Sequence, residues 1–234
     1  MADRLTRTIR ENYDKLAKEY ALHLFDELQH KPFDREVLTR FAHHTKNRGA
    51  LCDLGCGPGH VTRFLNDLQA PVFGIDVSPN MVAEARRLNP GLDFREGDML
   101  ALALPSGSVA GIVAFYAIVH LPPEHLSLAF NEMFRALESD GLVLMAFHVG
   151  DEIVHPDELW GVPLTMDFYL HQTATICQSL EAAGFAVEEV AEREPYPEVE
   201  YQSRRAYIFA RKPKSSAQSP SSAEAVSHPQ SPSN

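Results

Sequence analysis

The sequence predicts an α/β fold in which one mostly parallel, doubly wound sheet is covered by helices on both faces. Short apolar runs alternate with helical segments from residue 50 onward. The predicted strands are continuously apolar, which is typical of parallel strands buried on both faces. The first of them ends in a glycine-rich turn before a helix. A chain of 234 residues is long enough to bury the core of one such domain.

A helical cap is predicted for residues 1–49, ahead of the sheet. Apolar side chains recur at spacings of three and four through residues 1–30, which indicates one helix, and a second helix is expected after Pro32. The apolar positions of the first helix are Ile9, Tyr13, Leu16, Tyr20 and Leu24.

The sheet domain is predicted over residues 50–213 and should hold five parallel strands followed by an antiparallel hairpin pair. Strands are expected at residues 50–54, 72–75, 92–96, 109–115, 142–148, 185–192 and 205–211. Helices are expected at residues 60–68, 78–88, 123–137 and 173–183, the last of them ending at Gly184.

Two segments depart from the alternation of strands and helices. Residues 149–172 are too long for an ordinary loop and are rich in apolar side chains, including Trp160, the only tryptophan. Because they leave the end of the fifth strand, we expect them to form a lid over the ligand crevice. Residues 214–234 consist mostly of Ser, Pro, Ala and Gln, which predicts a disordered tail.

Composition excludes several classes of function. No apolar run approaches the ~20 residues that span a bilayer, and the charged N-terminus is unlike a signal peptide, so we expect a cytoplasmic protein without a membrane partner. The net charge of −11 disfavours nucleic acid as a partner. The three cysteines lack the spacing of a zinc site, and no carboxylate trio for Mg²⁺ is evident, so no metal is predicted. The oligomeric state is not predictable from the sequence.

The stretch Asp-Leu-Gly-Cys-Gly-Pro-Gly at residues 53–59 is the first candidate for binding. A buried strand runs into Gly55, Gly57 and Gly59, and a helix follows. Glycine allows a tight turn and a close approach of the backbone to a ligand, and a helix start offers unpaired N–H groups. The pattern is typical of nucleotide-binding loops, although a plain strand-to-helix turn would also explain the glycines.

Acidic residues follow the next two predicted strands. Asp76 ends the second strand and Asp98 follows the third. The carboxyl ends of parallel strands line one crevice, so these carboxylates should converge with Asp53. A carboxylate there can accept two hydrogen bonds from ribose hydroxyls. Their combination points to an adenosine ligand.

These motifs resemble a known family. The glycine loop, GIDVSPNM at residues 74–81 and GDM at residues 97–99 are similar to the first three motifs of class I S-adenosylmethionine-dependent methyltransferases. The resemblance covers roughly residues 10–212 and is greatest with the small-molecule, ubiquinone-biosynthesis-type branch. It implies a Rossmann-like fold, S-adenosylmethionine as the cofactor and a small-molecule methyl acceptor as the partner.

The resemblance assigns roles to the glycine loop and its neighbours. Gly55, Gly57 and Gly59 would approach the methionine part of the cofactor. Asp53 would support this loop and the cofactor's ammonium group, which the carbonyl of Phe115 would also accept.

Further cofactor contacts are implied after the second and third strands. Asp76 would hold the ribose hydroxyls, and Asp98 would accept from the adenine amino group, with the Met99 N–H on the ring. Val77 and Met81, in the second motif, are expected to contact the cofactor as well.

The alternatives concern both the cofactor and the class of function. Tyr20 resembles the N-terminal tyrosine that closes over the cofactor in this family, although simple packing explains it equally well. NAD is the second candidate cofactor, but its fingerprint needs a small residue where His60 stands, and a second domain for a substrate is missing. A non-catalytic sensor or partner subunit that binds S-adenosylmethionine is the alternative to an enzyme.

The acceptor side is predicted from residues near the ends of the fourth and fifth strands. His120 and His148 are the catalytic candidates, each able to position the acceptor or take its proton, with a structural histidine as the alternative. Tyr13, Tyr116 and Trp160 are the candidate substrate contacts. The predicted reaction is metal-independent, in-line methyl transfer, in which catalysis is mainly alignment in a closed site.

Overall fold

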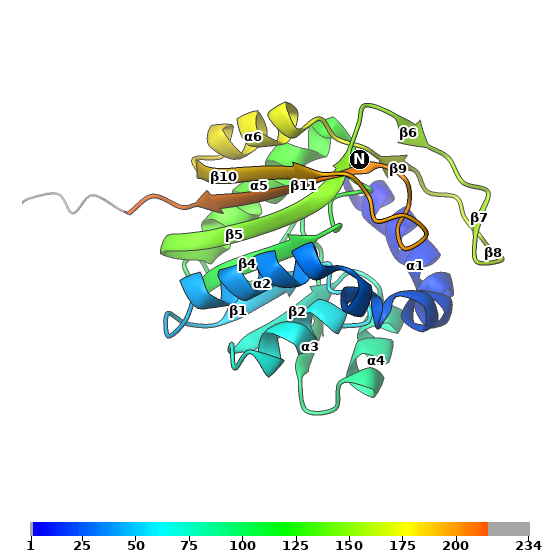
Figure 1. The fold of residues 1–234 in the computed structure, drawn as a ribbon, viewed down its shortest axis with the longest axis horizontal. Coiled ribbons are helices and arrows are strands. Elements are labelled where there is room, and N and C mark those ends of the chain that lie inside the picture. Colours follow the sequence, from blue (N-terminus) through cyan, green and yellow to red (C-terminus); the bar gives the residue numbers. More distant parts are fainter. Residues whose placement is uncertain (1, 215–234) are drawn as a thin grey trace, which may run out of the picture.

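A seven-stranded sheet forms the middle layer of the fold, as seen in the computed structural model, which describes residues 2–214 (Figure 1). The strand order is β3-β2-β1-β4-β5-β11-β10. The strands of this sheet are β1 Leu51–Leu54, β2 Val72–Asp76, β3 Asp93–Glu96, β4 Val109–Phe115, β5 Leu137–Val149, β10 Ala186–Arg193 and β11 Arg204–Arg211. The first five are parallel, and β11 lies antiparallel between β5 and β10. This confirms the predicted doubly wound, mostly parallel sheet with an antiparallel C-terminal strand.

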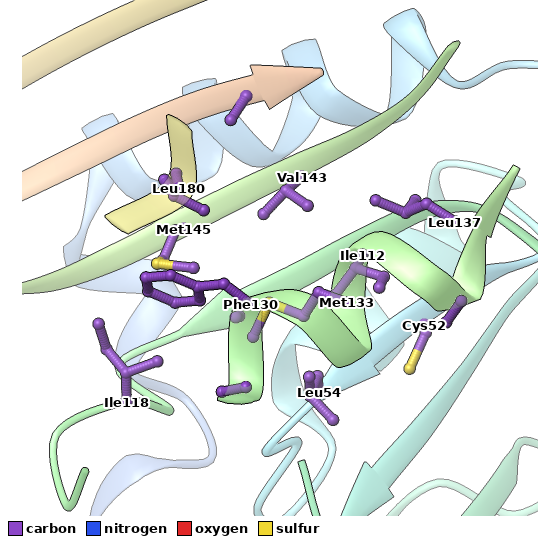
Figure 2. Close-up of a cluster of buried hydrophobic side chains, with 14 of the residues drawn as sticks. Cys52, Leu54, Ile112, Ile118, Phe130, Met133, Leu137, Val143, Met145 and Leu180 are labelled. Carbon is purple, nitrogen blue, oxygen red and sulfur yellow. The ribbon is translucent and has the colours of Figure 1, made fainter. Parts of the chain in front are cut away.

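Helices cover both faces of the sheet (Figure 1). They are α1 Ala2–Leu24, the 3-10 helix η1 Glu27–His30, α2 Pro32–His44, α3 His60–Asp67, α4 Pro79–Leu88, α5 Pro123–Ala136 and α6 Thr173–Ala182. One core lies between the sheet and the pair α5 and α6, where Phe130 and Met133 of α5 lie against Ile112 and Met145 of the strands (Figure 2). A second core lies on the opposite face beneath α2 and α3. Strand residues alternate between the two cores, which explains why the strands are apolar throughout.

The sequence prediction was wrong in two details of the elements. The predicted helix over residues 1–30 is two elements, because α1 ends at Leu24 and η1 follows. The fifth strand, expected at residues 142–148, already begins at Leu137, directly after α5. β5 pairs with β4 at Leu137 and again at Leu142, so residues 138–141 form an irregularity in the ladder, with Asp140 in a left-handed conformation at φ 66°.

Residues 149–172 form two short antiparallel ribbons at the end of the sheet where α1 lies (Figure 1). Their strands are β6 Ile153–Val154 with β9 Phe168–Tyr169, and β7 Glu158–Leu159 with β8 Val162–Pro163. Leu164 and Met166 pack with Leu16 of α1 in a small separate cluster. The predicted tail, apart from Lys214, lies outside the described residues. Within the described chain, no helix is long and apolar enough to cross a membrane.

Candidate active site

A cavity lies at the carboxyl ends of β1, β2 and β4, between the sheet and α1. This is the edge at which the sequence predicted a ligand crevice. The cavity brings together eleven of the predicted site residues, which are Tyr13, Tyr20, Gly55, Gly57, Asp76, Val77, Asp98, Met99, Phe115, Tyr116 and His120. We call it the cofactor cavity.

Two glycines of the loop after β1, Gly55 and Gly57, line this cavity. Gly55 and Gly57 have φ values of 73° and 51°, a region that side-chain-bearing residues rarely adopt. A Cβ added to Gly55 would lie 2.6 Å from the Cβ of Ala117, so the loop and the segment after β4 approach too closely for a side chain. A Cβ on Gly57 would instead lie 3.6 Å from the Tyr20 ring, beside open cavity.

Asp76 connects the glycine loop to the start of α4. Its Oδ2 accepts from the backbone N–H of Gly57 and its Oδ1 from the N–H of Ser78, both at 2.9 Å. Burial raises the pKa of Asp76 to about 6, although both amide hydrogen bonds favour the ionised form. Each carboxylate oxygen has a second lone pair, so Asp76 can still accept from ligand hydroxyls.

Asp98 lines the part of the cavity formed by the residues after β3 and contacts the helical cap. The hydroxyl of Thr6, on α1, donates to Asp98 Oδ2 at 2.7 Å. The backbone N–H of Leu100 donates to Oδ1 at 2.8 Å. The cap therefore closes over this part of the cavity through a direct contact with a predicted adenine-binding residue.

His120 connects the cap to the segment after β4. Its Nε2 lies 2.7 Å from the Tyr13 hydroxyl of α1, and its Nδ1 lies 2.7 Å from the backbone carbonyl oxygen of Asp167. Burial lowers the pKa of His120 to about 4, so the imidazole is neutral near pH 7. Both ring nitrogens thus have partners, so His120 could take up a proton at Nε2 only after the Tyr13 hydroxyl moves away.

A second cavity adjoins the first and shares Tyr20, Glu27 and Tyr116 with it. We call it the acceptor cavity. His148 lines it, with Nδ1 bonded to Ser203 Oγ at 2.8 Å, and burial together with Arg205 lowers the pKa of His148 to about 3. Trp160 lines it too.

Residues 149–172 place Trp160 at this cavity through a tight turn. Trp160 and Gly161 have φ values of 52° and 78° between β7 and β8, as in a hairpin turn with two left-handed residues. The Trp160 ring stacks on His23 with centroids 4.6 Å apart and meets the edge of Tyr20 at 5.8 Å. The insertion therefore contacts α1 beside both cavities.

Three predicted cofactor contacts lie behind the cavity wall instead. Asp53 is buried and accepts from Thr62 Oγ1 at 2.6 Å, which fixes the first turn of α3. A Cβ on Gly59 would meet the Phe94 ring at 2.6 Å, so helix–strand packing requires this glycine. Met81 is fully buried in α4. These three residues are buried in the fold and do not line the cofactor cavity, and His148 and Trp160 line only the acceptor cavity.

The structure also adds residues that the sequence did not indicate. Thr6, Glu27 and His60 line the cofactor cavity, and Lys31 and Arg205 line the acceptor cavity. The cap residues carry no motif, because their placement depends on how α1 and η1 fold over the sheet. Within the described residues, no group of three or more His, Cys, Asp or Glu side chains is arranged to hold a metal ion.

Comparison with known proteins agrees with this geometry. Residues 51–141 match the family described as a methyltransferase domain. This match agrees with the predicted resemblance to class I S-adenosylmethionine-dependent methyltransferases. The matched residues include the glycine loop, Asp76, Asp98 and His120.

Two curated proteins and one solved structure show how far the similarity extends along the chain. A probable S-adenosylmethionine-dependent methyltransferase of Mycolicibacterium smegmatis is 31% identical over 163 residues, which are 65% of this chain and 58% of that protein. A trans-aconitate 2-methyltransferase of Methylobacterium nodulans is 34% identical over 108 residues, or 45% and 40% of the two chains. The chain thus spans about half the length of the curated relatives that it matches. The crystal structure of a Methanosarcina mazei methyltransferase shares the fold, with a TM-score of 0.66, 16% identity, and coverage of 74% of this chain and 97% of that one.

Proposed function

We propose that this protein transfers the methyl group of S-adenosylmethionine to a small-molecule acceptor. The observation that carries the proposal is that one cavity is lined by glycines of the loop after β1, by Asp76 at the end of β2 and by Asp98 after β3. Class I methyltransferases use this strand edge for the cofactor, and the carboxylates there match its hydroxyl and amino donors. The name of the Methylobacterium nodulans relative, a trans-aconitate 2-methyltransferase, also supports a small-molecule acceptor.

The residues around the cofactor cavity fit this ligand. Gly57 leaves space where a side chain would enter the cavity, and Asp76 keeps free lone pairs beside it. Asp76 would hold the ribose, and Asp98 with Met99 the adenine. When bound, the cofactor supplies a methyl group that its sulfonium makes electrophilic. The protein's contribution is alignment of the acceptor with that methyl group and exclusion of water.

The acceptor is proposed to occupy the acceptor cavity. This cavity shares Tyr20 and Tyr116 with the cofactor cavity, so an occupant would reach the methyl group across these two rings. Trp160 would cover it from the lid. Tyr116 has a φ of 52° directly after β4, a strained conformation that is common at functional sites and supports a role in positioning.

His120 and His148 are proposed to act on the acceptor from two sides. His120 lines the cofactor cavity and His148 the acceptor cavity. Both are neutral near pH 7 because burial lowers their pKa values to about 4 and about 3. His148 can therefore accept a hydrogen bond or a proton from an acceptor that arrives protonated, and His120 can do so when the Tyr13 hydroxyl no longer donates to its Nε2.

One experiment tests the proposal and its alternative. The protein is titrated with S-adenosylmethionine and S-adenosylhomocysteine by calorimetry, and then incubated with S-adenosylmethionine and a metabolite extract. An enzyme produces S-adenosylhomocysteine and a methylated product that mass spectrometry identifies. Binding without turnover would favour the non-catalytic sensor or partner subunit, and absence of binding would refute the proposed cofactor.

A further inference from the structure

Glu27 lies where the two cavities meet. It is the first residue of η1, the short helix between α1 and α2, and lines both cavities. Its side chain is only 13% exposed, which is unusual for a glutamate. A buried carboxylate at a cavity wall requires partners, because its desolvation is costly.

Two basic side chains supply part of that compensation. Glu27 Oε2 accepts from Lys31 Nζ at 2.7 Å, and Oε1 lies 3.1 Å from His60 Nε2. Burial opposes the ionisation of Glu27, but His60 and Lys31 together lower its pKa to about 2. Glu27 is therefore a carboxylate, and each of its oxygens retains a lone pair for a further donor.

His60 has one ring nitrogen without a partner. A carboxylate only accepts hydrogen bonds, so Nε2 of His60 carries a proton and donates to Glu27. Nδ1 is buried and has no hydrogen-bond partner within the described residues. Of the described residues that line the cofactor cavity, His60 alone has such a buried side-chain atom, and leaving it unmatched carries a desolvation cost.

The position of this pair along the cavity suggests which part of the cofactor it meets. Asp98 belongs to the adenine end and Asp76 to the ribose. Glu27 and His60 line the cofactor cavity together with Gly57, and His60 directly follows the glycine loop, where the resemblance places the methionine part of the cofactor. Phe115, whose carbonyl the resemblance assigns to the ammonium group, lines the same cavity. The methionine part carries an ammonium group with three donors, which complements a carboxylate and an imidazole lone pair.

We propose that Glu27 and His60 Nδ1 together bind the ammonium group at the amino-acid end of S-adenosylmethionine. The proposal rests on the proposed cofactor. It makes the cap part of the binding site, because η1 supplies the carboxylate and the first residue of α3 supplies the imidazole. The same contact would hold η1 against the glycine loop when the cofactor is bound.

Binding of cofactor fragments tests the proposal without an acceptor. Calorimetry measures the affinity of four compounds: S-adenosylhomocysteine, its decarboxylated analogue, its deaminated analogue, and methylthioadenosine, which lacks both charged groups. The variants are Glu27→Gln, which removes the charge, and His60→Gln, whose amide can still donate to Glu27 but offers no atom in the place of Nδ1. Matched controls are Glu19→Gln, on the exposed face of α1, and His125→Gln, whose buried Nδ1 also lacks a partner but lies outside both cavities.

Glu27→Gln should weaken the binding of the two ammonium-bearing compounds by about tenfold or more, which is the usual loss of affinity for one charge-assisted hydrogen bond. His60→Gln should weaken the binding of the same two compounds by about threefold to tenfold, because a hydrogen bond to a neutral acceptor contributes less than one to a carboxylate. The deaminated analogue and methylthioadenosine should bind all variants within about twofold of the unmutated protein, and their binding also shows that the variants fold.

Three results would overturn the proposal. Equal weakening of the binding of all four compounds would indicate a structural role for Glu27 and His60. Weaker binding of only the two carboxylate-bearing compounds, S-adenosylhomocysteine and its deaminated analogue, would mean that His60 donates to the carboxylate instead. Unchanged binding of every compound would leave the pair without a role in recognition. Failure of the unmutated protein to bind any of the compounds would instead refute the proposed function itself.

Discussion

The Tyr13 hydroxyl donates a hydrogen bond to Nε2 of His120, with 2.7 Å between the two atoms. The direction follows from the other side of the ring, where Nδ1 lies 2.7 Å from the carbonyl oxygen of Asp167. A carbonyl only accepts, so Nδ1 carries the proton of the neutral imidazole and Nε2 keeps its lone pair. The cap, the lid and the segment after β4 are thereby joined through one side chain that faces the cofactor cavity.

The variant Tyr13→Phe should destabilise the protein and leave the Nδ1–H tautomer of His120 unchanged. Removing the donor leaves His120 Nε2 without a partner, which costs about 1–3 kcal/mol of the free energy of unfolding. Urea unfolding measures the loss, and ¹⁵N chemical shifts of the histidine ring report the tautomer. Tyr20→Phe is the matched control, because no hydrogen bond of the Tyr20 hydroxyl occurs within the described residues, and equal losses in the two variants would contradict the prediction.

Lowering the pH from 7 to 5 should reduce the contribution of His120 and His148 to stability. Their pKa values are about 4 and about 3 in the folded protein, against an ordinary value near 6.5, so the unfolded chain binds the protons first. The stability is fully present above pH 6.5 and is lost as the pH falls toward the folded values. For each histidine the loss between pH 7 and 5 is on the order of 2 kcal/mol.

Comparison of variants isolates this effect from the carboxylates. Asp53 and Asp76 have pKa values raised to about 6, mainly by burial, so they take up protons in the folded state and act in the opposite direction over the same range. Urea unfolding of His120→Gln and His148→Gln should therefore show less loss on acidification than the unmutated protein. If the difference in unfolding free energy between pH 7 and pH 5 were the same in the variants and the unmutated protein, the buried neutral state of both rings would be contradicted.

Alanine at Gly57 and at Gly59 should separate binding from stability. Both residues have positive φ, but a Cβ on Gly59 would lie 2.6 Å from the Phe94 ring, whereas one on Gly57 would lie 3.6 Å from Tyr20 beside the cavity. We expect Gly59→Ala to lower the unfolding free energy by more than about 2 kcal/mol and Gly57→Ala by about 1–2 kcal/mol. Affinity for S-adenosylhomocysteine should fall mainly in Gly57→Ala. Thermal unfolding measures the stability of the two variants and calorimetry their affinity. A greater loss of affinity in Gly59→Ala, or a greater loss of stability in Gly57→Ala, would contradict the prediction.

Affinity for S-adenosylhomocysteine should decrease as the pH falls through about 6, because protonation of Asp76 removes an acceptor for ribose hydroxyls. Asp76→Asn should bind more weakly at pH 7, by about tenfold or more for one charged hydrogen bond, and should lose most of this pH dependence. Asp93→Asn, on the exposed part of β3, is the control. Calorimetry at pH 5 and 7 would contradict the prediction if the two variants behaved alike.

Trp160 fluorescence should respond to ligands if residues 149–172 act as a lid. The indole stacks on His23 and contacts Tyr20, which lines both cavities, so occupancy should change the emission of the only tryptophan. Trp160→Ala should raise the KM for the acceptor found in the extract much more than the Kd for S-adenosylhomocysteine. If the lid merely covers the sheet edge, the emission stays constant and the variant loses only stability.

Much of the fold follows from local sequence patterns. Continuous apolar runs such as residues 109–115 become buried strands because both faces of a parallel sheet are covered. Gly184 ends α6 with a φ of 99°, as its position after an apolar helix predicts. Where a prediction failed, as at the start of β5, the chain already pairs with β4 at Leu137, and this contact between distant segments has no local sequence signal.

The sheet, the glycine loop and the line of acidic residues at the strand ends were predictable from the sequence alone, because each depends on short spacings along the chain. Which of these residues line the cofactor cavity depends on the tertiary structure. Gly57 borders the cofactor cavity and Gly59 packs on Phe94, although both belong to one motif. Glu27 reaches the same cavity from a segment without any motif, because burial and contact between distant segments depend on how the cap folds over the sheet.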